Sequence, residues 1–186
     1  MSDLDAFRIF TRIMDESVTT GGKRFALRSL FTPDMPGLHL LLHQLEGLVR
    51  TYLPALYARL QLLGITASTY ASPWFLTLFT YSFPLPLVFR IYDLILSEGA
   101  VIMMLKIGLA LLRRNEPVIL AMGEEDFEPV LEVLKGKGVL GVYYGHEVEG
   151  VIKDAALLDS VVTESALTKL TASLSTPCFV CTKYCH

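Results

Sequence analysis

The chain has 186 residues, of which 52% are hydrophobic and 19% charged, and its formal net charge is −3. This length predicts one domain, and this composition excludes a wholly disordered protein because it supplies ample apolar material for a core. There is no basic excess to favour a nucleic-acid surface, and the first 30 residues show no secretory signal pattern. All three cysteines lie in the last nine residues, which argues against a disulfide framework and predicts a reducing, cytoplasmic setting.

Helical periodicity dominates the first third of the sequence. The predicted helices here are 6–14, 38–49 and 53–63. Residues 17–24 are rich in Thr and Gly and predict a loop, and residues 31–37 predict a turn. Asp34 is the candidate N-cap of the second helix, with Pro36 in its first turn, and Gly64 is placed to end the third helix.

The middle of the chain carries further helix patterns separated by proline and glycine. The first predicted helix lies around Trp74, with Ser68, Thr69 and Ser72 as alternative caps and helical spacing as far as Phe79; those after it are 87–97, 100–114, 118–122 and 126–135. Asn115 and Pro117 predict a break between the third and fourth of these. Five side chains on the two helices flanking Pro84 are predicted to be core: Trp74, Phe75, Phe79, Phe89 and Leu94.

A membrane-embedded protein is the alternative that the mean hydropathy of +0.47 raises. No charged residue occurs from Leu60 to Phe89, which is long enough to cross a bilayer of ~30 Å. That stretch contains many polar residues and prolines, however, and no window of about 20 residues within it is both apolar and free of helix breakers. A soluble protein is therefore preferred.

The last quarter of the sequence is less regular. Residues 136–174 predict a glycine-rich linker followed by a peripheral helical extension, within which 139–144 is the one strand candidate. Residues 175–186 predict a disordered tail.

Three groups of residues have side chains suited to a chemical site, and each has an ordinary structural interpretation. His39 and His43 share one helix face, but no third metal ligand accompanies them, which favours a solvated face. Arg90 and Asp93 lie three positions apart on an apolar helix, where pairing with each other or with neighbouring helix ends is favoured over catalysis because isolated buried charges are unfavourable.

The third group is the cysteine cluster at the end of the chain. Cys178, Cys181, Cys185 and His186 are crowded into nine residues, whereas zinc sites usually join two separated half-sites. The sequence therefore predicts no metal, cofactor or catalytic residue.

Several separate motifs resemble those of one family in their order and spacing. They are Leu30–Leu38, Leu53–Leu60, Ile65–Ser72, Tyr70–Thr80 and Phe83–Gly99, the last containing Val88-Phe-Arg-Ile-Tyr-Asp93. Together they resemble the C-terminal half of the TBC domain of Rab GTPase-activating proteins, over roughly Asp5 to Lys135. The resemblance implies an all-α, single-domain helical array with a Rab-type small GTPase as partner and a role in vesicle trafficking.

The same resemblance implies that catalysis depends on residues outside the matched motifs. In that family, an arginine from an Ile-x-x-Asp-x-x-Arg motif and a glutamine from a Tyr-x-Gln motif accelerate GTP hydrolysis. Neither motif occurs in this sequence. Because an arginine finger contributes a factor of about 10³–10⁵ to the rate, the expectation is that the chain is not an enzyme and is inactive alone.

The sequence thus predicts a fragment of a Rab GTPase-activating protein, with residues 1–135 as the C-terminal half of a TBC domain. A non-catalytic helical interaction module is the alternative. Peripheral association with endomembranes through partners, and self-association through an uncovered apolar face, are further expectations.

Overall fold

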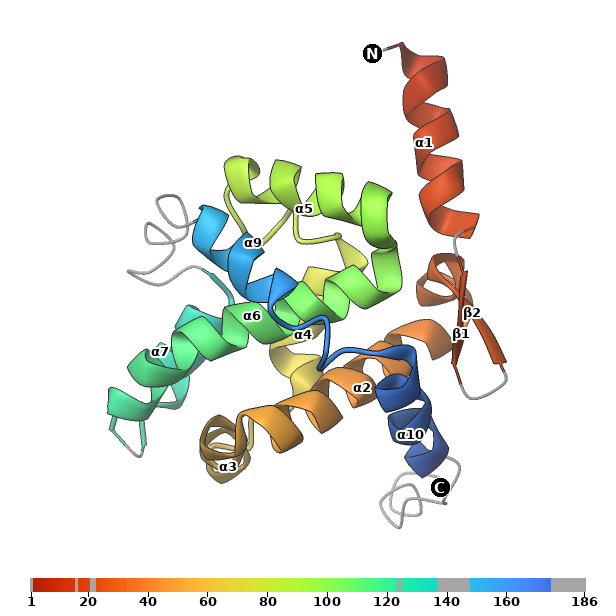
Figure 1. Ribbon diagram of the computed structural model, residues 1–186. Coiled ribbons are helices and arrows are strands. Elements are labelled where there is room, and N and C mark those ends of the chain that lie inside the picture. The colour runs from red at the N-terminus through yellow and green to blue at the C-terminus, as the bar shows by residue number, and fades with distance from the viewer. Residues whose placement is uncertain (1, 16, 21–22, 124, 137–147, 175–186) are drawn as a thin grey trace.

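The computed structural model describes residues 2–15, 17–20, 23–123, 125–136 and 148–174 (Figure 1). Within these ranges the chain forms nine α-helices, one 3₁₀ helix and one two-stranded hairpin, so the predicted all-α fold is confirmed. None of the described helices combines the length and apolar character that a membrane crossing requires. The hairpin, β1 (Ser17–Thr20) antiparallel to β2 (Lys23–Ala26), occupies the segment for which the sequence predicted a loop.

One helix precedes the hairpin and the other elements follow it. They are α1 (Asp3–Asp15), η1 (Leu27–Leu30), α2 (Pro36–Tyr52), α3 (Pro54–Leu62), α4 (Ala67–Leu76), α5 (Leu85–Glu98), α6 (Ala100–Ala121), α7 (Phe127–Leu134), α9 (Val148–Ala156) and α10 (Glu164–Leu174). In Figure 1, α6 runs through the middle of the array and α1 stands apart from it at one edge. Consistent with this, α6 packs against α2, α3, α5, α7 and α9.

The turn before α2 has an unusual backbone. Asp34 and Met35 both have positive φ, at 61° and 43°, and Met35 rather than Asp34 is the N-cap residue, so the predicted capping role of Asp34 is wrong. Pro36 opens the helix as predicted, because its fixed φ suits the first helical position. The next residue, Gly37, lies so close to η1 that a Cβ there would sit 2.8 Å from the Ser29 backbone, which explains the need for glycine.

The C-termini of α3 and α4 end in the same hydrogen-bond pattern, in which a backbone N–H donates to the carbonyl five residues earlier. The residue before that N–H has a positive φ, and it differs between the two helices. After α3, the Ile65 N–H donates to the Leu60 carbonyl at 2.8 Å, and Gly64 supplies the positive φ of 68°, as predicted. After α4, the Phe79 N–H donates to the Trp74 carbonyl at 2.7 Å, but Leu78 takes the positive φ of 47°. A leucine in this conformation is strained by about 1–2 kcal/mol, so packing on both sides must hold it there.

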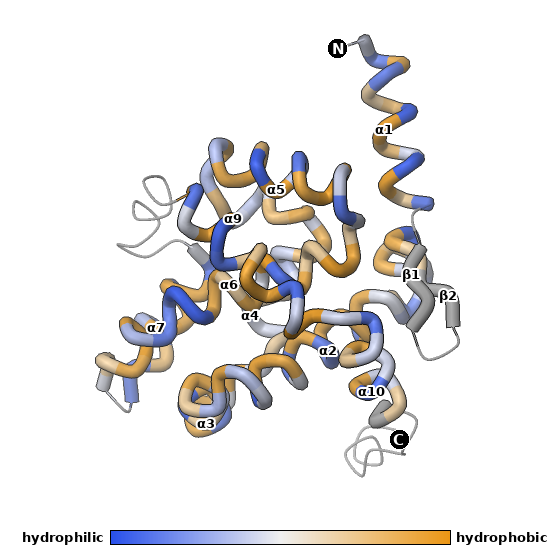
Figure 2. The backbone as a smooth tube through the Cα atoms, viewed as in Figure 1, coloured by the Kyte–Doolittle hydropathy of each residue, from blue (hydrophilic) through white to orange (hydrophobic). Residues whose placement is uncertain are grey.

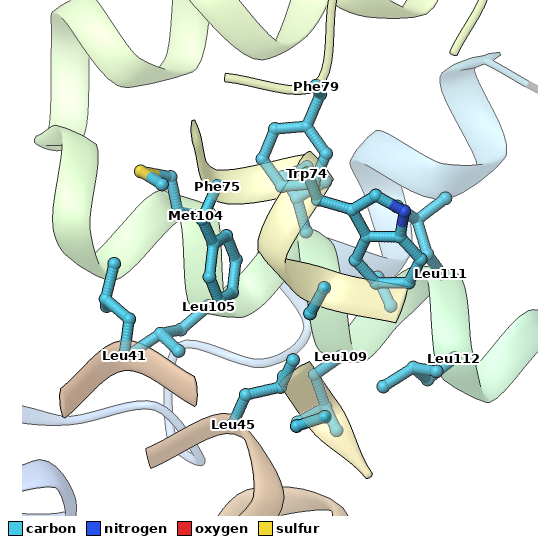
Figure 3. Close-up of a cluster of buried hydrophobic side chains, with 14 of the residues drawn as sticks. Leu41, Leu45, Trp74, Phe75, Phe79, Met104, Leu105, Leu109, Leu111 and Leu112 are labelled. Atoms are coloured by element: carbon cyan, nitrogen blue, oxygen red, sulfur yellow. The ribbon is translucent and has the colours of Figure 1, made fainter. Parts of the chain in front are cut away.

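An aromatic cluster built by α4 and the following turn forms the centre of the core. The Trp74 ring centroid lies 5.3 Å from that of Tyr70 and 5.6 Å from that of Phe83. Figure 3 shows Trp74 and Phe75 packed among leucines from α2 and α6. Burial, with a smaller contribution from the charge of Glu46, raises the pKa of Tyr70.

Three of the five predicted core residues are confirmed. Trp74, Phe75 and Phe79 are fully buried, and Leu94 is partly buried. Phe89 is 64% exposed, so its prediction is wrong. The reason is the rotation of α5, which turns Leu87, Val88, Ile91 and Ile95 towards the core and leaves Phe89 on the opposite face.

The predicted break at Asn115 and Pro117 is also wrong, because α6 continues through both residues to Ala121. A proline inside a helix removes one backbone hydrogen bond and costs about 3 kcal/mol. Asn115 and Ile119, on either side of it, are buried against neighbouring elements. Tertiary packing on both sides of Pro117 thus outweighs its local cost.

The 148–174 segment forms two helices, α9 and α10, that are less peripheral than their sequence predicted. Val151 and Ala155 of α9 and Leu167 of α10 are fully buried in the common core. Their weak apolar periodicity hid this, since only a narrow stripe of each helix faces inward. The boundaries at residues 135 and 174 stay predictions, and the strand candidate 139–144 and the tail 175–186 lie outside the described residues.

Candidate functional site

The most conspicuous surface of the molecule is the apolar face of α1. Leu4, Phe7 and Phe10 are 57%, 62% and 53% exposed, and Met14 continues the same face one turn further on. Ile13, at the edge of this face one turn after Phe10, is the one residue of α1 that is buried. Figure 2 shows this helix as alternating hydrophobic and hydrophilic bands that stand away from the array. Three large exposed apolar side chains on one helix mark an interaction surface.

The apolar face of α1 continues into a groove of about 500 Å³. Its walls come from α1, from the η1–α2 turn and from the strained turn after α4. The lining residues are Phe10, Thr11, Met14, Arg28, Phe31, Leu76, Thr77 and Leu78. We call the exposed face of α1 and this groove together the α1 surface.

The polar groups of the groove are largely engaged within the protein. The Thr11 hydroxyl donates to the Arg8 carbonyl at 2.9 Å, and the Thr77 hydroxyl donates to the Pro73 carbonyl at 2.7 Å. Arg28 pairs with Asp15 at the rim, where both side chains are mostly exposed. The groove therefore offers apolar area and one cation, which suits a protein side-chain ligand rather than acid–base chemistry.

A second apolar surface lies on the outer face of α5. Leu85, Phe89 and Leu96 are each at least half exposed, and they recur at helical spacing with the partly buried Tyr92 between them. We call these residues the α5 stripe. Its exposure follows from the same rotation of α5 that buries Ile91.

Arg90 borders the α5 stripe and joins α5 to α9. Its guanidinium donates to Glu149 at 2.9 Å and to Asp93 at 3.3 Å. The predicted Arg90–Asp93 pairing is confirmed, and Glu149 is a further partner that sequence could not reveal. The hydrogen bond to Glu149, together with both negative charges, raises the pKa of Arg90.

Two more ion pairs attach the α9 region to α6. Lys106 is nearly buried, with 8% of its side chain exposed, and pairs with Asp159 and, at 3.4 Å, with Glu98. Arg114 donates to Asp154 at 2.6 Å. Sequence reasoning missed these roles, although a single lysine inside an apolar helix was a signal that it needed a partner.

Of the two histidines predicted to lie on a solvated helix face, His43 contributes to the packing of α10 on α2. The Nε2 of His43 donates to the Leu170 carbonyl at 3.1 Å, so His43 is partly covered rather than on a solvated face, while His39 is exposed. Within the described ranges, no group of three or more His, Cys, Asp or Glu side chains is placed to hold a metal ion. The cysteine cluster lies outside those ranges.

Comparison with known proteins gives one consistent result. The family model described as RabGAP TBC domain matches residues 1–167. The chain is 37% identical over 168 residues to "GTPase-activating protein GYP5" of Eremothecium gossypii, which covers 88% of this chain and 19% of that protein. It is 42% identical over 113 residues to the Saccharomyces cerevisiae protein of the same name, covering 61% and 12% respectively.

A mammalian relative matches a similar stretch. The chain is 38% identical over 125 residues to "Ecotropic viral integration site 5 protein" of Mus musculus, covering 67% of this chain and 14% of that protein. The chain thus spans less than a fifth of the length of each of these relatives.

These matches overturn one expectation. The prediction that the chain is not an enzyme is wrong at the level of the family, since its relatives are named GTPase-activating proteins and the matched domain model is a RabGAP model. The expectation rested on two short motifs, whereas the match extends over most of the chain.

Proposed function

Because this chain belongs to the RabGAP TBC domain family, we propose that it takes part in GTPase activation by binding a small GTPase of the Rab type. The observation that carries the proposal is the family match over residues 1–167, which includes every described element except the end of α10. The role in vesicle trafficking and a place at the periphery of endomembranes, reached through the GTPase, follow from the same proposal.

We assign the GTPase contact to the α5 stripe. It is an exposed apolar surface on a helix that is otherwise part of the core, and such surfaces on globular domains mark protein contacts. Arg90 and its two carboxylate partners border it, which supplies the charged rim typical of a specific interface. The α5 helix is held rigidly, by Ile91 and Ile95 below and by Glu149 of α9 beside it.

The proposal predicts that Phe89→Glu weakens binding to the GTPase by about tenfold or more, because it places a charge at the centre of an apolar contact. Binding of the full chain to a panel of Rab proteins, each loaded with GDP or with a non-hydrolysable GTP analogue, is measured by fluorescence anisotropy. Leu62→Glu on α3 is the matched control, since Leu62 is 67% exposed and lies outside the stripe.

Two results would contradict the assignment. One is a chain that binds no panel member in either nucleotide state. The other is a Phe89→Glu variant that binds as tightly as the parent chain, which would move the contact away from α5.

A further inference from the structure

We infer that Glu149 of α9 is a positioning residue for the GTPase contact, because it holds the Arg90 guanidinium beside the α5 stripe. The inference rests on the proposed function and deepens it, since it gives α9 a part in the contact that α5 makes. Glu149 lies outside every motif that resembles the family. Its role follows from the geometry of three charged groups between α5 and α9.

The α5 stripe has a carboxylate at its edge. Asp93 follows Phe89 by four residues and precedes Leu96 by three, so it lies beside both on the helix surface. Its side chain is mostly exposed. A carboxylate that a partner covers without a counter-charge loses its hydration at a large cost. The stripe is therefore best covered while a cation stays on Asp93.

Arg90 supplies that cation, and Glu149 fixes its orientation. The Nη1 of Arg90 donates to Asp93 at 3.3 Å, while its Nε and Nη2 donate to the two carboxylate oxygens of Glu149 at 2.9 and 3.5 Å. Two donations to one carboxylate hold the planar guanidinium in a single orientation, which the one long bond to Asp93 would not do. Arg90 is therefore ordered before any partner arrives.

Glu149 can serve this purpose because α9 is itself fixed in place. The helix packs against both α5 and α6 (Figure 1), and Val151 is buried in the common core. Arg114 of α6 donates to Asp154 of α9 at 2.6 Å. The two carboxylates thus differ in what they hold, since Asp154 attaches α9 to α6 and Glu149 attaches it to α5. Asp154 is therefore a matched control for Glu149.

Glu149→Gln is expected to weaken binding to the GTPase by about three- to tenfold, because a long side chain must then be ordered when the complex forms. Asp154→Asn, which removes the other carboxylate of α9, is expected to bind within about twofold of the parent chain. Fluorescence anisotropy of the full chain with the Rab panel measures both Kd values. Circular dichroism verifies that each variant keeps the fold.

A double-mutant cycle tests whether Glu149 acts through Arg90. In an Arg90→Ala background, Glu149→Gln is expected to cause no further weakening, since no guanidinium is left to position. An equal loss with and without Arg90 would overturn the inference. So would a Glu149→Gln variant that binds like the parent, or an equal loss in Asp154→Asn, which would show that α9 matters only as a structural support.

Failure of the proposed GTPase contact would give a different pattern. If Phe89→Glu weakens binding and Glu149→Gln does not, the contact at α5 stands and the role of Glu149 alone is overturned. If no member of the panel binds, or if Phe89→Glu binds as tightly as the parent, the contact at α5 is overturned and the role of Glu149 with it.

Discussion

A chain that ends at Lys135 is expected not to fold, although the motifs that resemble the family all lie within it. Besides the small Ala155, the missing part supplies five branched apolar side chains that are each less than 10% exposed: Val151, Ile152, Leu158, Val162 and Leu167. Full burial of one such side chain contributes about 1.5–3 kcal/mol, and a domain of this size is stable by only about 5–15 kcal/mol. Loss of the five is comparable with the whole stability.

The truncation also removes counter-charges. Lys106 would lose Asp159, and Arg114 would lose Asp154. The nearly buried ammonium of Lys106 would keep only Glu98, at 3.4 Å, so its charge would be less well compensated. Thermal unfolding followed by circular dichroism measures the effect, with residues 1–174 as the control because that chain keeps every contact described above. A cooperative transition of the 1–135 chain within about 5 °C of the control would contradict the prediction.

The second large effect is expected at the aromatic cluster. Trp74→Ala should lower the free energy of unfolding by about 3–5 kcal/mol, because it removes the largest fully buried side chain and leaves a cavity. Trp74→Phe should cost much less. The Trp74 Nε1 is buried and has no hydrogen-bond partner among the described residues, so the phenylalanine loses volume but no described polar contact.

Urea unfolding at equilibrium tests this pair of variants, with the ellipticity of the helices as the signal. Intrinsic fluorescence is unsuitable because Trp74 is the only tryptophan in the chain. Leu62→Ala is the control, and as an exposed substitution it should change stability by no more than about 0.5 kcal/mol. A loss below about 1 kcal/mol in Trp74→Ala would show that the cluster does not organise the core.

The sequence predicted those parts of the fold that local signals determine. Apolar periodicity located α2 and α5, and Gly64 located the end of α3, because each is a property of a few neighbouring residues. Periodicity extended α4 too far, since the helix ends at Leu76 and Phe79 lies in the turn that follows. The same reasoning failed at Pro117, where the local preference to end a helix is real but burial on both sides overrides it.

Side-chain placement between elements could be predicted less well. Phe89 and Ile91 are both large and apolar on the same helix, and only the orientation of α5 in the array decides which is buried. One partner of Lys106, Asp159, lies 53 residues away in the sequence, beyond the reach of any local pattern. The α1 surface combines residues from α1, the η1–α2 turn and the turn after α4, so no single segment of sequence predicts it.

The turn after α4 illustrates a case where local signals point the wrong way. A positive φ normally favours glycine, yet Leu78 and Phe79 adopt φ of 47° and 68°. Burial of both side chains, at 8% and 0% exposure, holds this conformation. In this conformation Leu78 lies in the wall of the groove and Phe79 lies in the aromatic cluster. The turn therefore joins the core to the α1 surface.

The most direct test of the proposed role in GTPase activation is a chimera. The matching segment of the GYP5 protein of Eremothecium gossypii is replaced by residues 1–167 of this chain, and GTP hydrolysis is measured under single-turnover conditions with a small GTPase that the parent protein activates. Our account predicts stimulation within about tenfold of the parent, against a total effect that reaches about 10⁵ for GTPase activation. A folded chimera that gives less than about 1% of the parent's stimulation would contradict it.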